Sequence, residues 1–374
     1  MIAIVATRHC TGDTAAVPSI TCDAFTGRRH SIERSLVCAM QGQFPVLARD
    51  AAGTLAAVFR TGASHYGLAG TLATAWSIDG GRRWSDPIDV APRGDDLRNP
   101  AFAIAADGRW LLAYWQAGVR CYPGGAWKLP VAGDDRADLF VIASTDQGRT
   151  WSAPRAQRSE LLAWASPYGR MVHVDGTWLL AAYGRPHGGT DRARSGLPES
   201  QLDAIVLRSR DGVTWGDESR VLAGASELAL CSVSPDHLIG AVRRSERDTA
   251  IVHSRDGGRT WSAPVAVTRA NEHPADLCVL AGGPLLLTFG RRVRPLGCGA
   301  LASRDLGATW DREALLAGDG IGNDVGYPST VQLDDGTLCT AIYFARGSAA
   351  SDPSDGWGET SCQLLRYPEA LVTD

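Results

Sequence analysis

The 374-residue chain contains almost no lysine: Lys128 is the only one. Its 37 Lys and Arg residues are outnumbered by 41 Asp and Glu residues, which gives a formal net charge of −4 without long runs of one sign. A surface that binds nucleic acid or an anionic membrane needs a concentrated basic patch. We therefore expect neither nucleic acid nor a membrane as a partner.

The cysteines form no regular pattern. There are nine of them, an odd number, and no two are spaced as Cys-x-x-Cys. This arrangement argues against a zinc site and against a disulfide framework. We expect no metal and no other cofactor, and we expect free thiols of the kind found in a reducing cytoplasm.

Long apolar stretches are missing as well. No segment approaches the roughly 20 residues that a membrane-spanning helix needs. The first eight residues, MIAIVATR, lack the basic start of a secretory signal peptide. With 44% hydrophobic and 21% charged residues, the composition is that of a globular protein. These absences predict a cytoplasmic protein.

One short motif is present five times. It reads Ser-x-Asp-x-Gly-x-x-Trp, the third copy is one residue short, and successive copies begin 67, 65, 45 and 49 residues apart. The copies occupy 77–84, 144–151, 209–215, 254–261 and 303–310. Asp bonds its own backbone, Gly permits positive φ and Trp anchors the turn. A turn that recurs at such spacings predicts a repeat architecture.

A second pattern lies between these copies: two apolar runs joined by a Gly- or Asp-containing turn. It occupies 44–59, 101–115, 170–184, 229–242, 277–290 and 329–344. Each motif hairpin follows one of the first five, and the sixth unit ends in a strand-like tail at 362–367. Four strands per unit and six units predict an all-β fold, a six-bladed β-propeller. We expect one domain, 1–374, in which 1–40 is an extension outside the blades or a closing strand.

Antiparallel strand order divides the polar residues between two rims. The motif turns join the third and fourth strands of each unit, so they lie at the rim away from the start of the first strand. We interpret them as structural elements and not as catalytic groups. The opposite rim collects many charged residues at strand 1 starts and strand 2 ends. A solvated rim explains any one arginine there, but together they indicate an anionic or polyhydroxylated ligand. The candidate substrate-binding residues are Arg60, Arg98, Arg170, Arg243, Arg292, Asp276 and Asp324.

The repeated motif resembles the Asp-box of the sialidase (neuraminidase) superfamily. That resemblance implies an arginine triad for a carboxylate, a Tyr nucleophile paired with a Glu, and an Asp acid/base. Glu227 followed by Arg243 is similar to the family's Glu and second arginine, and Tyr327 opens the last hairpin, where the family places its nucleophile. An exposed loop carboxylate and a rim aromatic are the structural alternatives for Glu227 and Tyr327. Side chains alternate between the two faces of a strand, and this alternation favours Arg292 over Arg291 as the third arginine.

The chain departs from the family pattern at two points. Gln43 stands where the family has its first arginine, and residues 60–66 contain no carboxylate to serve as the acid. Arg60 could replace the arginine, and His65 could donate a proton near neutral pH, although a surface histidine is the alternative. Both departures could equally mean a substrate other than sialic acid.

Three functions remain open because fold alone does not choose among them. The first is a sialidase-like exo-glycoside hydrolase that cleaves a terminal, acidic sugar, with Tyr327, Glu227 and His65 as catalytic residues. The second is an enzyme on the same scaffold with His-dependent glycosidase or lyase chemistry on a uronic or deoxy sugar. The third is a non-catalytic sugar-binding propeller. In each case the partner is a small molecule or glycan, and we expect weak or absent cleavage of ordinary sialosides.

Overall fold

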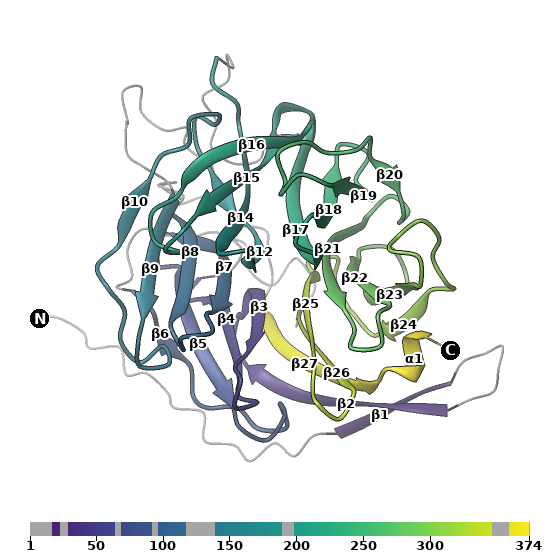
Figure 1. The fold of residues 1–374 in the computed structure, drawn as a ribbon. Helices are drawn as coiled ribbons and strands as arrows, with labels where there is room; N and C mark the ends of the chain where they lie inside the picture. Colours follow the sequence, from purple (N-terminus) through teal and green to yellow (C-terminus); the bar gives the residue numbers. More distant parts are fainter. Residues whose placement is uncertain are drawn as a thin grey trace, which may run out of the picture.

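Six β-sheets stand in a ring around a central channel (Figure 1). The computed structural model describes residues 17–22, 29–63, 69–91, 96–116, 139–188, 198–345 and 359–373, with side chains from residue 31 onwards. The six-bladed propeller predicted from the repeats is confirmed. His65 lies outside the described residues. Within them, no helix is long and apolar enough to cross a membrane.

The first three blades come from the N-terminal half of the chain. Blade 1 contains β3 (Gln43–Arg49), β4 (Leu55–Thr61), β5 (Thr71–Ser77) and β6 (Ile88–Asp89). Blade 2 contains β7 (Leu97–Ile104), β8 (Trp110–Gln116), β9 (Leu139–Ser144) and β10 (Arg155–Gln157). Blade 3 contains β11 (Ser166–Pro167), β13 (Val172–Val174), β14 (Thr177–Gly184), β15 (Asp203–Ser209) and β16 (Gly216–Ala223), with the short helix η1 (Glu199–Gln201) before β15. The inner strand of blade 3 is divided, and β12 (Gly169–Arg170) pairs in parallel with β7 of blade 2.

The other three blades complete the ring. Blade 4 contains β17 (Ala225–Ser234), β18 (His237–Arg244), β19 (Thr249–Ser254) and β20 (Val265–Ala266). Blade 5 contains β21 (Glu272–Val279), β22 (Leu285–Arg291), β23 (Gly297–Ser303) and β24 (Ala314–Ala317). Blade 6 contains β25 (Gly326–Gln332), β26 (Thr337–Ala345), β27 (Thr360–Pro368), β2 (Arg29–Cys38) and β1 (Val17–Cys22), and α1 (Ala370–Thr373) follows β27.

The N-terminal part of the chain closes the ring. Strand β2 pairs antiparallel with β27, so the outer part of the last blade comes from the beginning of the chain. Ile32 on β2 is fully buried between blades 5 and 6. Arg34 donates two hydrogen bonds, of 2.7 and 2.8 Å, to the carboxylate of Asp319. Strand β2 therefore acts as a closing strand, while residues 1–16 and 23–28 lie outside the described residues and the single-domain division stays a prediction.

The core lies between neighbouring blades, and both faces of each sheet are buried. Successive side chains of a strand point to opposite faces, so one strand contributes to two interfaces. On β4, Ala57 and Phe59 pack toward blade 6, whereas Ala56 and Val58 pack toward blade 2. This explains the nearly continuous apolar runs in the sequence.

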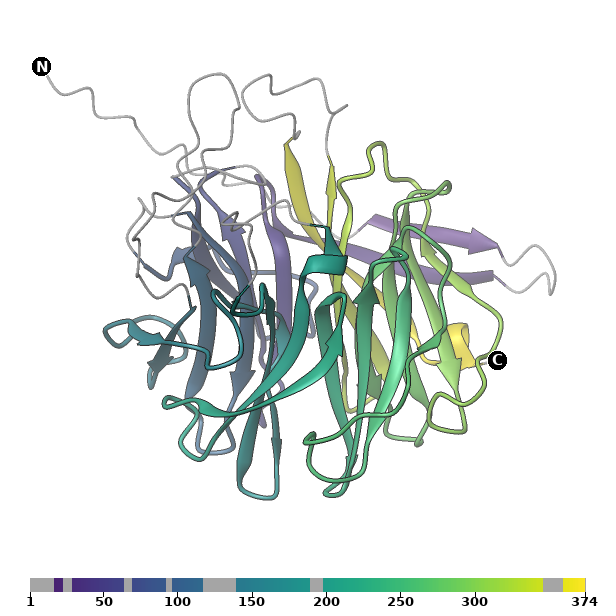
Figure 2. The same ribbon diagram turned by 90° about the horizontal axis from the view of Figure 1, so that it is seen from above.

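The Asp-box turns are held by their own side chains. In the first copy, Ser77 Oγ accepts a hydrogen bond from Gly81 N at 2.8 Å, and Asp79 Oδ1 accepts from the backbone N–H groups of Arg82 and Arg83, each at 3.0 Å. The register pairs Ser77 with Leu55 and Gln43 with Arg60, so the turn lies at the opposite end of the blade from the start of strand 1. Figure 2 shows the strands running between the two rims.

Candidate functional site

A β-bulge marks the start of the inner strand in five of the blades. At each bulge two residues oppose one, and the pairs are Phe44–Pro45, Asn99–Pro100, Ser226–Glu227, His273–Pro274 and Tyr327–Pro328. The φ angle is positive at Phe44 (55°), Asn99 (47°) and Tyr327 (55°), a conformation that non-glycine residues rarely adopt. Bulges re-aim side chains, and these turn five inner strands toward a common site at one end of the channel.

Tyr327, Glu227 and Arg243 form one contact chain across this site. The Tyr327 hydroxyl donates a short hydrogen bond to Glu227 Oε1, and Arg243 Nη1 donates to Glu227 Oε2 at 2.9 Å. Tyr327 is 7% exposed and Glu227 is 3% exposed. The two residues come from blades 6 and 4, one hundred positions apart. Glu227 is therefore not the exposed loop carboxylate that was its structural alternative, and Tyr327 is a buried aromatic at the same rim.

A fourth residue, Glu199, extends this chain. It lies on η1 and forms a short ion pair with Arg243 Nη2, so Arg243 is held between two carboxylates. The pKa of Arg243 is raised: burial opposes the charge, but Glu227 and then Glu199 outweigh it. The guanidinium is therefore a fixed cation at any pH relevant to the protein.

Burial raises the pKa of Tyr327 well above its usual value, and the negative charge of Glu227 raises it further. These two effects dominate, and the cation that acts in the opposite direction is Arg292. The phenol is therefore neutral near pH 7, with its proton directed at a carboxylate oxygen. Such a pair can transfer the proton as the phenol oxygen attacks an electrophile.

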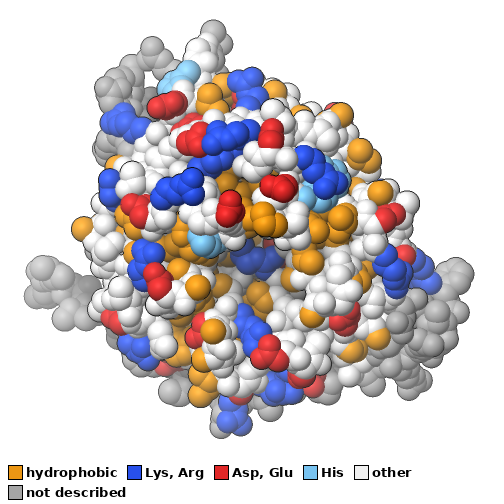
Figure 3. Space-filling view, in the orientation of Figure 1, with side chains coloured by type: hydrophobic (Ala, Val, Ile, Leu, Met, Phe, Trp, Pro, Cys, Tyr) orange, Lys and Arg blue, Asp and Glu red, His pale blue; other side chains and the backbone are white. Residues whose placement is uncertain are grey.

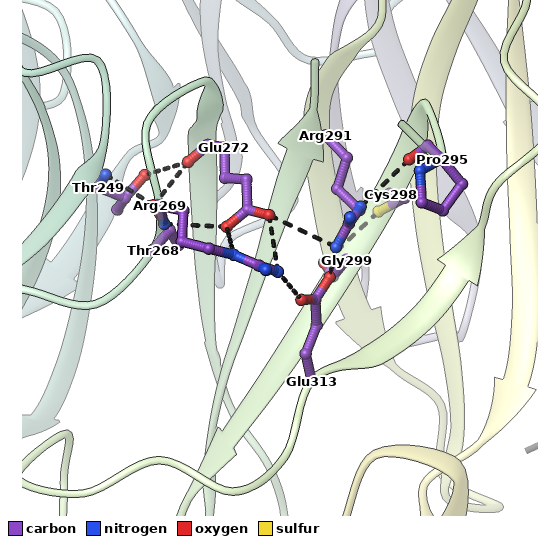
Figure 4. A network of polar contacts seen from close by, with 9 residues as sticks. All are labelled: Thr249, Thr268, Arg269, Glu272, Arg291, Pro295, Cys298, Gly299 and Glu313. Atoms are coloured by element: carbon purple, nitrogen blue, oxygen red, sulfur yellow. Dashed lines mark hydrogen bonds and ion pairs between the residues drawn. The ribbon is translucent and has the colours of Figure 1, made fainter. Parts of the chain in front are cut away.

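Arg292, not Arg291, lies against the nucleophile candidate. Its guanidinium carbon is 6.0 Å from the centroid of the Tyr327 ring, and its Nε donates to Val325 O at 3.1 Å. Arg291 instead points into a separate network, where it pairs with Glu313 and lies 3.5 Å from Glu272 (Figure 4). The side chains of successive strand residues point to opposite faces, so the parity argument selected the residue that faces the site.

A small pocket on the channel axis adjoins Tyr327. Its lining includes Phe44, Asn99, Tyr168 and Asp276. Asn99 Nδ2 donates to Ser166 Oγ and to Tyr183 Oη, both at 2.8 Å. These contacts fix the amide from blade 2 beside an aromatic wall.

Asp276 and Arg170 close the channel below this pocket. Arg170 Nη2 lies 3.1 Å from the Asp276 carboxylate, and Asp276 Oδ2 accepts from Thr330 N at 2.7 Å. Burial raises the pKa of Asp276, although Arg170 opposes this. Arg170 also lines a second hollow, which opens at the centre of the Asp-box face (Figure 3). The pair thus separates the two openings, and of its members only Asp276 lines the pocket beside Tyr327.

Arg60 and Arg98 share one buried carboxylate. Arg60 Nη2 and Arg98 Nη2 each lie 2.7 Å from an oxygen of Asp96, and Arg60 is 0% exposed. The structure does not bring Arg60 to the pocket, and substrate binding by Arg60 stays a prediction that would require this cluster to open. Gln43 is also fully buried.

Asp324 lies behind the nucleophile candidate. Its Oδ1 accepts a 2.7 Å hydrogen bond from Tyr343, whose ring centroid is 5.8 Å from that of Tyr327. Asp324 is 5% exposed, so it supports the aromatic wall. The position of the acid/base candidate His65 falls outside the described residues, and its role stays a prediction.

Sequence reasoning assigned no role to two residues near this chain. Glu199 gave no signal, because it lies between repeats and meets Arg243 only in the folded ring. The His273 bulge precedes Pro274 just as the Tyr327 bulge precedes Pro328, so the X-Pro pattern at strand 1 starts could have identified it. Its pKa is lowered by burial and by Arg243 and Arg292, so this buried imidazole is neutral. No cluster of potential metal ligands occurs in the described parts of the chain.

Six blades, Asp-box turns and a buried Tyr–Glu–Arg chain at one channel mouth define a propeller of the Asp-box class. Residues 90–340 match the family described as a BNR repeat-like domain. The chain belongs to this family and is a divergent member of the sialidase superfamily.

Individual relatives are distant. A sialidase of Bacteroides fragilis (strain YCH46) is 24% identical over 302 residues, which are 70% of this chain and 52% of that protein. This chain therefore spans about half the length of that relative.

Solved structures share the fold. A protein of unknown function from Dyadobacter fermentans DSM 18053 superimposes with a TM-score of 0.72 at 22% identity, over 90% of this chain and 98% of its own. The Hadza microbial sialidase Hz136 gives a TM-score of 0.65 at 20% identity, over 89% and 66% of the two chains. At these identities the likeness shows the fold alone.

Proposed function

We propose that the protein is an exo-glycoside hydrolase of the sialidase type that cleaves a terminal, acidic sugar. The observation that carries the proposal is the buried contact chain from the Tyr327 hydroxyl through the Glu227 carboxylate to Arg243. Sialidases use a tyrosine nucleophile where other glycosidases use a carboxylate. The sialidase relatives support a glycosidase scaffold.

In the proposed reaction, the Tyr327 oxygen bonds to the anomeric carbon while Glu227 takes the phenolic proton. The glycosidic C–O bond breaks, and its oxygen leaves with a proton from a general acid, for which His65 is the sequence-predicted donor. Water then attacks the anomeric carbon and loses a proton to the group that served as general acid, the bond between this carbon and the Tyr327 oxygen breaks, and the phenol oxygen takes back its proton from Glu227. Because the phenol is neutral before attack, it approaches an anionic sugar without the repulsion that a carboxylate would meet.

A panel of 4-methylumbelliferyl glycosides of sialic, uronic and neutral sugars tests this proposal. We expect turnover of at least one acidic glycoside. The Tyr327→Phe variant should lower kcat by a factor on the order of 10³ or more with little change in ligand affinity, since only an interaction made in the transition state is removed. Tyr367→Phe, which alters a buried tyrosine on β27, the middle strand of the same blade, is the matched control.

Two results would count against the proposal. No turnover of any acidic glycoside, together with measurable sugar binding, would favour a non-catalytic sugar-binding propeller. Full activity in Tyr327→Phe would remove the tyrosine mechanism and leave chemistry based on His65 as the alternative.

A further inference from the structure

Both terminal nitrogens of the Arg243 guanidinium are already paired with carboxylates. Glu227 binds Nη1, and Glu199 binds Nη2. The side chains of Arg243, Glu227 and Glu199 are only 15%, 4% and 17% exposed, so water screens their charges poorly. One guanidinium and two carboxylates give this trio a formal charge of −1. An arginine that receives a substrate carboxylate would be expected to keep at least one terminal nitrogen unpaired instead.

The position of Glu199 relative to the reaction follows from the proposed function, on which this inference rests. The attacking oxygen must approach the anomeric carbon to about 3–3.5 Å. Tyr327 Oη and Arg243 Nη1 bind the two oxygens of one carboxylate, that of Glu227. Arg243 is therefore adjacent to whatever group the anomeric carbon carries. A carboxylate attached there, as in a sialoside, would meet Glu199 and be repelled.

A carboxylate elsewhere on the sugar ring meets a different cation. Within the described part of the chain Arg292 makes no ion pair, and its hydrogen bond to Val325 O uses only Nε. Its guanidinium lies over the ring of Tyr327 rather than at the hydroxyl end of the contact chain. Arg292 can therefore pair with an acidic group that is separated from the anomeric carbon.

We infer that Glu199 is a specificity-determining residue and that the substrate is a glycoside of a terminal uronic acid. In a uronic acid the anomeric carbon carries hydrogen, and the carboxylate is attached to C5, on the other side of the ring oxygen. Glu199 fills the place of an anomeric carboxylate on Arg243, and Arg292 binds the carboxylate on C5. The neutral tyrosine nucleophile still suits the substrate, because the sugar remains an anion.

Dissociation constants of two free sugar acids at pH 7 test the inference without turnover. The wild-type protein should bind glucuronic acid at least about tenfold more tightly than N-acetylneuraminic acid, since mispairing one buried charge costs at least that much affinity. Glu199→Gln should strengthen binding of N-acetylneuraminic acid at least about tenfold and leave glucuronic acid within about threefold. Glu246→Gln, the same substitution at an exposed residue on the blade that carries Arg243, should behave as wild type.

Melting temperatures establish that each variant is folded, and Glu199→Ala should give the same shift as Glu199→Gln. The inference is overturned if wild-type protein and both Glu199 variants share one preference, if wild type prefers N-acetylneuraminic acid, or if it binds neither acid. Failure of the proposed function is a separate result. It would show as absent hydrolysis of all glycosides, while the binding preference could still follow Glu199.

Discussion

Glu227 divides its two carboxylate oxygens between a proton donor and a cation. One oxygen faces the Tyr327 hydroxyl and the other faces Arg243. The arginine fixes the orientation of the carboxylate, so the oxygen that accepts the proton is already in place. Burial keeps the phenol protonated, and attack and proton transfer therefore have to occur together. Tyr327 and Glu227 act as one unit in this account.

A double-mutant comparison tests that unit. We expect Glu227→Gln to lower kcat by about 10²–10⁴, the usual contribution of a general base. Because the tyrosine and the glutamate serve one step, the double variant with Tyr327→Phe should be little slower than the slower single variant. Steady-state kcat values of the wild type, the two single variants and the double variant test this expectation. Multiplicative losses would mean that the two residues act independently.

Two kinds of local element build the molecule at opposite ends of each blade. At one rim the Asp-box turns tie strand 3 to strand 4 through side-chain to backbone bonds. In the fourth copy, Asp256 accepts from the Thr260 hydroxyl at 2.6 Å and from Thr260 N at 2.9 Å. At the other rim, bulges break the ladder and direct site residues inward. The Asp-box turns stabilise the blade, and the bulges position the side chains of the candidate site.

The Asp-box carboxylates predict a specific loss of acid stability. The hydrogen bond from Thr260 helps to lower the pKa of Asp256 from 3.8 to about 2. Because the folded pKa is the lower one, the ionised carboxylate stabilises the protein above about pH 4, and this is lost as pH falls through 2. Asp256→Asn should therefore lower the melting temperature more at pH 7 than at pH 2.

Melting curves of wild type and Asp256→Asn between pH 7 and pH 2 provide the measurement. Asp236→Asn, in the exposed β17–β18 turn of the same blade, is the matched control and should cause little change. A difference between wild type and Asp256→Asn that stays constant across this range would show that ionisation of Asp256 does not contribute to stability.

At the scale of the whole molecule, the ring brings residues from distant blades to one point. Tyr327 and Glu227 touch across blades 6 and 4, and this depends on closure of the ring by β2. The architecture was predictable from the sequence because each repeat contains its own turn residues and apolar runs. The candidate site was predictable only where a residue's rim and face follow from its position in the repeat, as for Tyr327, Glu227, Arg243 and Arg292.

The remaining site features depend on contacts between repeats. The burial of Arg60 follows from Asp96 of the next blade, which no local pattern connects to it. Glu199 lies on a short helix between repeats, so its approach to Arg243 is a property of the ring. The division of the inner strand in blade 3 likewise arises from pairing of β12 with blade 2. Such contacts have no signature in the spacing of residues.

The central claim is that Tyr327 forms a covalent bond to the sugar, and trapping that intermediate tests it most directly. A fluorinated glycosyl fluoride of a cleaved acidic sugar slows breakdown of the intermediate more than its formation. After incubation and proteolysis, mass spectrometry should find the added sugar mass on the peptide that contains Tyr327, and Tyr327→Phe should show none. Sugar mass on another residue, or steady turnover of the natural glycoside with no adduct at Tyr327, would contradict the account.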